Sequence, residues 1–161
     1  MLGSSDRETL STAGNLALLL ARTGRVDEAI QHQKSVLALS TKSLGKAHPE
    51  TLTAAGNLAA SYLRADDPAA AEPLNREVLS LAEATFGPDN TFTLTARNNL
   101  AVTLSYLGDT AAAAAQYDAV LEARRRQLPA DHPHLLTSLF KYLSCRFAWL
   151  FFLYRLPCRS C

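Results

Sequence analysis

The chain has 161 residues, of which 48% are apolar and 19% charged, and its net charge is +1. This composition is typical of a globular protein with one core, and it excludes disorder over most of the length. Residues 1–139, the body of the chain, hold all 15 Asp and Glu but not all of the 16 Lys and Arg, so acidic residues outnumber basic ones there. The body has no basic stripe of the kind that nucleic-acid-binding domains show, so we expect no nucleic-acid partner.

The N-terminal segment MLGSSDRETL contains neither a basic stretch followed by an apolar run nor a glycine at position 2. It therefore predicts no secretory signal and no myristoylation site. The three cysteines, Cys145, Cys158 and Cys161, all fall near the C-terminal end, so the body uses no disulfide. These features favour a cytoplasmic protein.

The chain repeats itself at an offset of 42 residues without gaps. Three sets of identical residues coincide at this offset: Thr9-Leu10, Thr51-Leu52 and Thr93-Leu94; Asn15-Leu16-Ala17, Asn57-Leu58-Ala59 and Asn99-Leu100-Ala101; and Ala29, Ala71 and Ala113. A fixed period in this range indicates stacked supersecondary units. We expect units at about residues 6–48, 49–90 and 91–132, with a fourth beginning at residue 133.

Each unit shows two helical patterns, with apolar residues at intervals of three and four. The turns between them are predicted at Gly24, at Asp66-Asp67-Pro68 and at Gly108-Asp109-Thr110, and the starts of new units at His48-Pro49 and His132-Pro133. Asp67 is expected to cap the following helix, with Pro68 in its first turn. Pro73 falls inside the same helix and predicts a local kink.

Alanines at positions 17 and 29, the turn residue Gly24, the NLA motif and the linker pattern LGxxHPxTL together resemble tetratricopeptide repeats of the kinesin-light-chain type. That type has the longer, 42-residue unit, whereas the ordinary tetratricopeptide unit has 34 residues. The resemblance covers residues 6–139. It implies an all-α fold, a right-handed superhelical solenoid of antiparallel helix pairs, with three repeats plus a C-terminal helix.

The resemblance also implies a function, since the first helices of such solenoids line a concave groove that binds a peptide segment of a partner protein. Asparagine recurs once per unit beside the expected groove, where its amide either holds a peptide backbone or bonds within the scaffold. Arginine at positions 22 and 64 either meets an acidic group of the partner or is simply solvated. The predicted groove residues are Asn15, Leu18, Arg22, Asn57, Ala60, Arg64, Asn98, Asn99, Val102 and Tyr106.

No phosphate loop, HExxH, GxSxG or dinucleotide motif occurs in the sequence. His132 and His134 belong to a linker motif that His48-Pro49 repeats, so we predict no metal site. We expect no cofactor and no enzymatic activity. The run Arg124–Arg126 is expected to be a solvated helix end.

Residues 140–161 form an aromatic, basic, cysteine-containing tail with seven of the twelve aromatic residues. Three interpretations stay open: a helix packed on the end of the solenoid, an interfacial helix that attaches the protein to an anionic membrane surface, and an artefact of truncation or reading frame. A peptide-binding scaffold is therefore the predicted function. Membrane attachment through the tail, with the repeats as a spacer, and self-association through the solenoid ends are the alternatives.

Overall fold

The computed structural model describes residues 23–129 and 132–153, with residues 145–153 described by their backbone alone, and residues 12, 14, 16, 17, 19 and 20 before them. This part of the chain contains helices and turns but no strand. Its six labelled helices are α2 (Val26–Leu44), α3 (Pro49–Arg64), α4 (Pro68–Phe86), α5 (Thr91–Tyr106), α6 (Thr110–Gln127) and α7 (Pro133–Leu153). The described residues between 12 and 20 are also helical.

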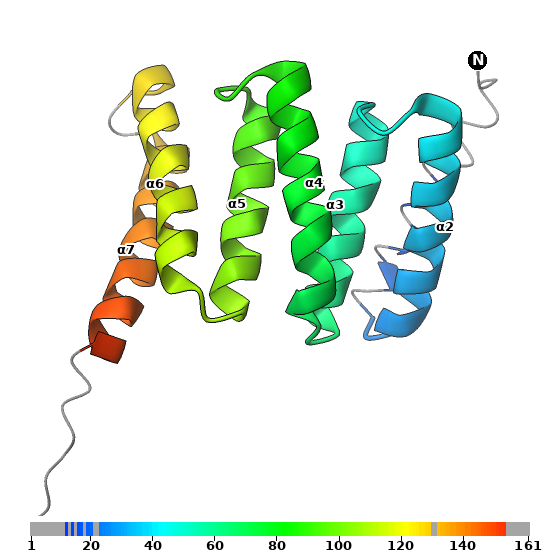
Figure 1. Cartoon of the computed structure of the whole chain (residues 1–161), viewed down its shortest axis with the longest axis horizontal. Helices are drawn as coiled ribbons and strands as arrows, with labels where there is room; N and C mark the ends of the chain where they lie inside the picture. Colours follow the sequence, from blue (N-terminus) through cyan, green and yellow to red (C-terminus); the bar gives the residue numbers. More distant parts are fainter. Residues whose placement is uncertain are drawn as a thin grey trace, which may run out of the picture.

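The helices stand side by side in chain order, from α2 at one end to α7 at the other (Figure 1). From α2 to α7, consecutive helices pack against each other, and α3 also contacts α5. Since short turns join successive helices, the neighbours run antiparallel. The predicted all-α solenoid of helix pairs is therefore confirmed.

The turns inside the helix pairs depend on residues with positive φ. Gly24 and Gly108 have φ of 85° and 81°, a left-handed conformation that costs glycine little. Asp66 takes the equivalent position in the second pair with φ of 58°. The predicted cap at Asp67 is confirmed, because its Oδ1 accepts a hydrogen bond of 3.0 Å from the backbone N–H of Ala70.

The links between the pairs follow a second pattern. Gly45 and Gly87 end α2 and α4, and their φ values of 89° and 85° are in the left-handed region that favours glycine. The side chain of His48 accepts a hydrogen bond of 3.2 Å from the N–H of Glu50 and so caps α3. The helix α4 continues through Pro73 without interruption, and a local kink there stays a prediction.

Alanine allows the two helices of each pair to approach closely. The alanines at the repeat-equivalent positions 17, 59 and 101 of the first helices, and 29, 71 and 113 of the second, are almost completely buried. A continuous core extends from α3 to α6 around Leu52, Val78, Leu100 and Leu104. Each fully buried leucine contributes about 1.5–3 kcal/mol relative to an exposed one.

The prediction of a solvated arginine run at the end of α6 is wrong for Arg124. Its guanidinium is partly buried and donates to the backbone oxygen of His134, at 3.2 Å, and to Ser138 Oγ, at 2.6 Å. The cause is that α7 continues the solenoid and packs against α6, which covers this part of its last turn. Arg125 and Arg126 are exposed, as expected.

The tail prediction is only partly tested. The helix α7 packs against α6, in agreement with a helix on the end of the solenoid. Among the described helices, none combines the length and the apolarity that crossing a bilayer requires. The aromatic side chains after residue 144 and the final CRSC lie outside the described residues.

Candidate functional site

The first helices of the pairs present one face that the core does not cover. We call it the candidate binding face. It runs across α3, α5 and α7 at the three-and-four spacing, and its residues are exposed or half-buried: Thr53, Gly56, Asn57, Ala60, Leu63, Arg64, Thr95, Asn98, Asn99, Val102, Ser105, Tyr106, Thr137, Phe140 and Lys141. Most of these side chains are small and neutral, so the face can accommodate an extended polypeptide.

Two asparagine amides of this face are half-buried and available for hydrogen bonds. The side chains of Asn57 and Asn99 make no hydrogen bond to another described residue. A Cβ atom placed on Gly56 would lie 4.0 Å from Asn99 Nδ2, so this amide reaches over α3 at its glycine. A side-chain amide has two donors and an acceptor oxygen, which match the alternating groups of a peptide backbone.

Asn98 differs from these two because its amide already has a partner. Asn98 Oδ1 accepts a hydrogen bond of 2.9 Å from Lys141 Nζ on α7. Asn99 and Gly56 are related in the same way as Lys141 and Asn98. In both pairs, a residue of one first helix lies near the residue 43 positions earlier, on the first helix of the previous unit. Asn98 therefore links two first helices and holds the ammonium group of Lys141 beside the face.

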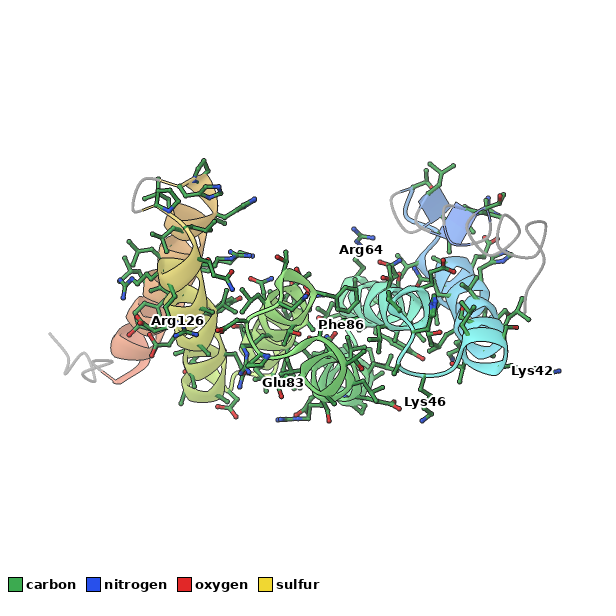
Figure 2. The ribbon with its side chains drawn as sticks, turned by 90° about the horizontal axis from the view of Figure 1, so that it is seen from above. Lys42, Lys46, Arg64, Glu83, Phe86 and Arg126 are labelled. Atoms are coloured by element: carbon green, nitrogen blue, oxygen red, sulfur yellow. The ribbon has the colours of Figure 1, made fainter. Side chains whose placement is uncertain are left out.

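Cations flank the face, and none of its positions is Asp or Glu. The exposed side chain of Arg64 makes no ion pair with a described residue and projects from the ribbon on the side opposite Lys46 (Figure 2). The pKa of Lys141 is lowered, first by burial and then by the positive charge of Arg124. Burial also lowers the pKa of Arg124. A carboxylate beside Lys141 would favour its charged form, which burial and Arg124 both disfavour.

Two large aromatic residues lie at the solvent-exposed part of the face. Tyr106 is 59% exposed and Phe140 is 72% exposed. Exposed aromatic side chains offer a large contact area at a small cost in conformational entropy. Val102 lies four residues before Tyr106 on α5 and is half-buried, since it also packs against the core.

The structure thus brings together Asn57, Ala60, Arg64, Asn98, Asn99, Val102 and Tyr106 of the predicted residues. The predicted residues Asn15, Leu18 and Arg22 lie outside the described residues. Sequence reasoning missed Phe140 and Lys141 as members of the face. The 42-residue offset would have found them, because they are the equivalents of Asn98 and Asn99 in the fourth unit.

No group of metal-ligating side chains occurs among the described residues. His132 and His134 act in the linker instead, where His132 Nδ1 accepts a hydrogen bond of 3.2 Å from the N–H of His134. This contact caps the start of α7 in the way that His48 caps α3.

Comparison with known proteins gives a family match. A model of the tetratricopeptide repeat matches residues 8–84 and 57–126, which together make up well over half of the chain. No curated protein matches the chain.

Solved structures with the same fold include a putative kinesin light chain from Podosopora anserina with nearly identical TPR-like repeats. It has 24% identity and a TM-score of 0.81, over 87% of this chain and 66% of that chain. Another is BtubC (BKLC) from P. vanneervenii, with 20% identity and a TM-score of 0.79, over 89% of this chain and 57% of that chain. The chain thus spans less than two thirds of either structure, and at these identities the likeness shows the fold alone.

Proposed function

We propose that this chain, which belongs to the tetratricopeptide repeat family, is a non-catalytic scaffold that binds a peptide segment of a partner protein on the candidate binding face. Solenoids of this kind use an extended concave surface for binding. The observation that carries the proposal is the pair of half-buried amides of Asn57 and Asn99, which lack partners among the described residues.

The charge of the face indicates what the peptide contains. Arg64 lies on α3, seven residues after Asn57, and Lys141 lies on α7, the first helix that follows that of Asn99. No acidic residue occupies the face. A partner segment that carries Asp or Glu would pair with these cations. We therefore propose an acidic peptide.

The asparagines cannot supply the whole affinity. A net hydrogen bond contributes about 0.5–1.5 kcal/mol, so four bonds from two amides give about 2–6 kcal/mol before the cost of association. Micromolar binding needs about 8 kcal/mol net. Burial of apolar side chains against Tyr106, Phe140 and Val102 has to provide the rest.

Peptide display on the full chain tests the proposal. We expect an enriched motif that contains Asp or Glu and loses affinity as salt increases. The triple variant Asn57→Ala/Arg64→Ala/Asn99→Ala should lose this enrichment while circular dichroism shows unchanged helix content. The control Arg76→Ala removes another exposed arginine, on α4, and should keep it. Enrichment that the triple variant retains would contradict the proposal.

A specific observation favours a second candidate, self-association through the C-terminal end. Leu136 is 56% exposed on α7. Phe140 and Leu143 are exposed too, and they follow Leu136 at intervals of four and three residues, so the three side chains lie on one side of the helix. The equivalents of Leu136 and Leu143 in the previous unit, Leu94 and Ala101, are buried. Light scattering should report a dimer that Leu136→Ser/Phe140→Ser converts to a monomer, and a monomeric parent chain would exclude this candidate.

Membrane-surface attachment through the basic aromatic tail stays a prediction. Of the tail residues that suggest it, those from 145 to 153 are described by their backbone alone, and those from 154 on lie outside the described residues. Flotation with vesicles that contain anionic lipid, compared between the full chain and residues 1–139, would support it only if flotation depends on the tail.

A further inference from the structure

The end helix α7 has an apolar face that no helix of the described structure covers. On α5, the equivalent residues Leu94 and Ala101 are buried, and Leu94 packs against Val120 of α6. The residues at these two positions of α7 are Leu136 and Leu143, which are 56% and 40% exposed. The positions that a second helix covers in the previous unit are therefore apolar but open on α7.

This face points away from the rest of the solenoid. Ser138 is buried and accepts a hydrogen bond from Arg124 of α6, so its side of α7 faces the previous unit. Phe140 follows Ser138 by two residues, which is about 200° around the helix, and it is 72% exposed. Leu136 and Leu143 lie within about 60° of Phe140 around the helix. The three side chains therefore project outward from the end of the row of helices that Figure 1 shows.

The spacing of these three side chains is nearly symmetric about Phe140. Leu136 precedes Phe140 by four residues, and Leu143 follows it by three. In an antiparallel pair of two such helices centred near Phe140, Leu136 of each copy lies opposite Leu143 of the other, and the two phenyl rings meet. A two-fold interface requires a surface that is complementary to itself, and this face has that property.

Antiparallel pairing also keeps charge out of the contact between the helices. Lys141 is the one charged residue between Leu136 and Leu143. Its Nζ donates to Asn98 Oδ1 on α5, at 2.9 Å, so the ammonium group is held on the side of the candidate binding face. Consecutive helices of the described solenoid pack in the same antiparallel way, so the contact would continue an arrangement that the structure already contains.

We propose that a second copy of this chain covers the face, with its α7 antiparallel to the first α7 and the two-fold axis close to Phe140. This pairing gives a geometry to the self-association described under the proposed function, and it rests on that self-association. Each copy contributes three large apolar side chains, so the interface is small. We expect a weak dimer whose population depends on concentration.

The antiparallel arrangement determines where the two candidate binding faces lie. Its two-fold axis is perpendicular to the paired helices and to the line that joins them, because the helices point in opposite directions. That line follows the row of helices in Figure 1, and the candidate binding face contains both directions, so the axis points out of the face. Rotation about this axis leaves both faces on the same side and joins them into one surface, with Phe140 and Lys141 of both copies at its centre. A parallel pair would turn the two faces in opposite directions.

Cysteine cross-linking tests the pairing in the full chain. The natural cysteines are removed in a Cys145→Ser/Cys158→Ser/Cys161→Ser background, and Leu136→Cys and Leu143→Cys are introduced into it separately. Under mild oxidation, a mixture of the two variants should form a disulfide between positions 136 and 143 of opposite copies, because the pairing brings them face to face. Either variant alone should cross-link about tenfold less, since two copies of the same residue are about 9–12 Å apart along the helix axis, too far for a disulfide.

Two control variants show whether the contact is specific. Thr95→Cys in the same background places a thiol at an exposed site of α5 and should not cross-link. Leu39→Ser removes another exposed leucine, on α2, and should leave the dimer intact. Cross-linking of Thr95→Cys to the same extent as the mixed pair would mean that the contacts are random, and it would overturn the proposal.

Light scattering of the cysteine-free chain, over a concentration series up to about 1 mM, separates the two ways in which the proposal can fail. A chain that stays monomeric excludes self-association altogether and overturns the pairing with it. A dimer in which Leu136→Cys cross-links with itself, or in which the mixed variants do not cross-link, retains self-association and overturns the antiparallel pairing alone. None of these results depends on peptide binding at the candidate binding face.

Discussion

Replacing Gln33 by leucine should make the protein more stable. Gln33 lies on α2 and is 3% exposed, and neither amide atom has a hydrogen-bond partner among the described residues. Its equivalent on α4, Asn75, is equally buried but donates a hydrogen bond of 2.8 Å to Thr103 Oγ1. Ser61, the equivalent of Thr103, is also buried without a partner among the described residues. The interface between α2 and α3 therefore has polar residues at the two equivalent positions, Gln33 and Ser61, but no hydrogen bond joins them.

The expected gain follows from two contributions. A buried polar group without a partner costs about 1–3 kcal/mol, which Gln33→Leu removes. Leucine differs from glutamine in shape, and a poor fit in a packed core costs about 1 kcal/mol or more. We expect the free energy of unfolding to rise by about 1–2 kcal/mol. For a protein of this size that corresponds to an increase in Tm of roughly 2–8 °C.

Urea and thermal unfolding followed by circular dichroism measure this change, and two variants serve as controls. Gln31→Leu makes the same change at an exposed site of α2 and should stay within about 0.5 kcal/mol of the parent. Asn75→Leu breaks a formed hydrogen bond and should destabilise the protein by about 1–2 kcal/mol. A loss of stability in Gln33→Leu, with Gln31→Leu unchanged, would show that the amide of Gln33 has a partner and would refute the reasoning.

Three further predictions concern other sites. Asp66→Gly should raise the free energy of unfolding by about 0.5–1 kcal/mol in urea denaturation, because glycine tolerates the positive φ. Leu100→Ala should lower it by about 3 kcal/mol in the same assay, since this leucine is fully buried in the core. In an NMR titration, Lys141 should deprotonate at a lower pH than Lys46, whose pKa is raised by Glu77. Because the fold disfavours the charged form of Lys141, its contribution to stability should improve as the pH rises from its folded pKa toward its unfolded pKa.

The helices and their ends could be predicted from the sequence because local chemistry determines them. The caps at His48 and Asp67 and the glycines at positions 45 and 87 act within one turn of the residue concerned. The 42-residue period then implies how the helices stack, because an amphipathic helix pair has to bury its apolar face against the next pair. The role of Arg124 was not predictable in this way, since it depends on α7 covering the end of α6.

The candidate binding face was predictable in position but not in detail. The spacing in the sequence places Asn57, Asn98 and Asn99 near one face of the helices. It does not tell which of these amides already has a hydrogen-bond partner within the protein. That depends on Lys141, which reaches Asn98 from the next unit and leaves Asn99 beside Gly56. A side chain that crosses between helices is a property of the pair of units, so a repeat pattern read one unit at a time cannot reveal it.

Interfaces with equivalent backbones also differ in strength, because their side chains differ. Between the second and third units, Arg97 is held by Glu83 and Gln116, and Asn75 bonds Thr103. Between the first and second units, the equivalent positions give a cavity, and the buried polar groups of Gln33, Thr51 and Ser61 have no hydrogen-bond partner in the part of the chain that the structure describes. In a solenoid, stability is a sum of units and of nearest-neighbour interfaces. The interface of α2 with α3 should therefore open at a lower free energy than that of α4 with α5, and hydrogen exchange should be faster in α2 than in α5. Equal protection in both helices would mean that the buried polar groups do not decide where this solenoid opens.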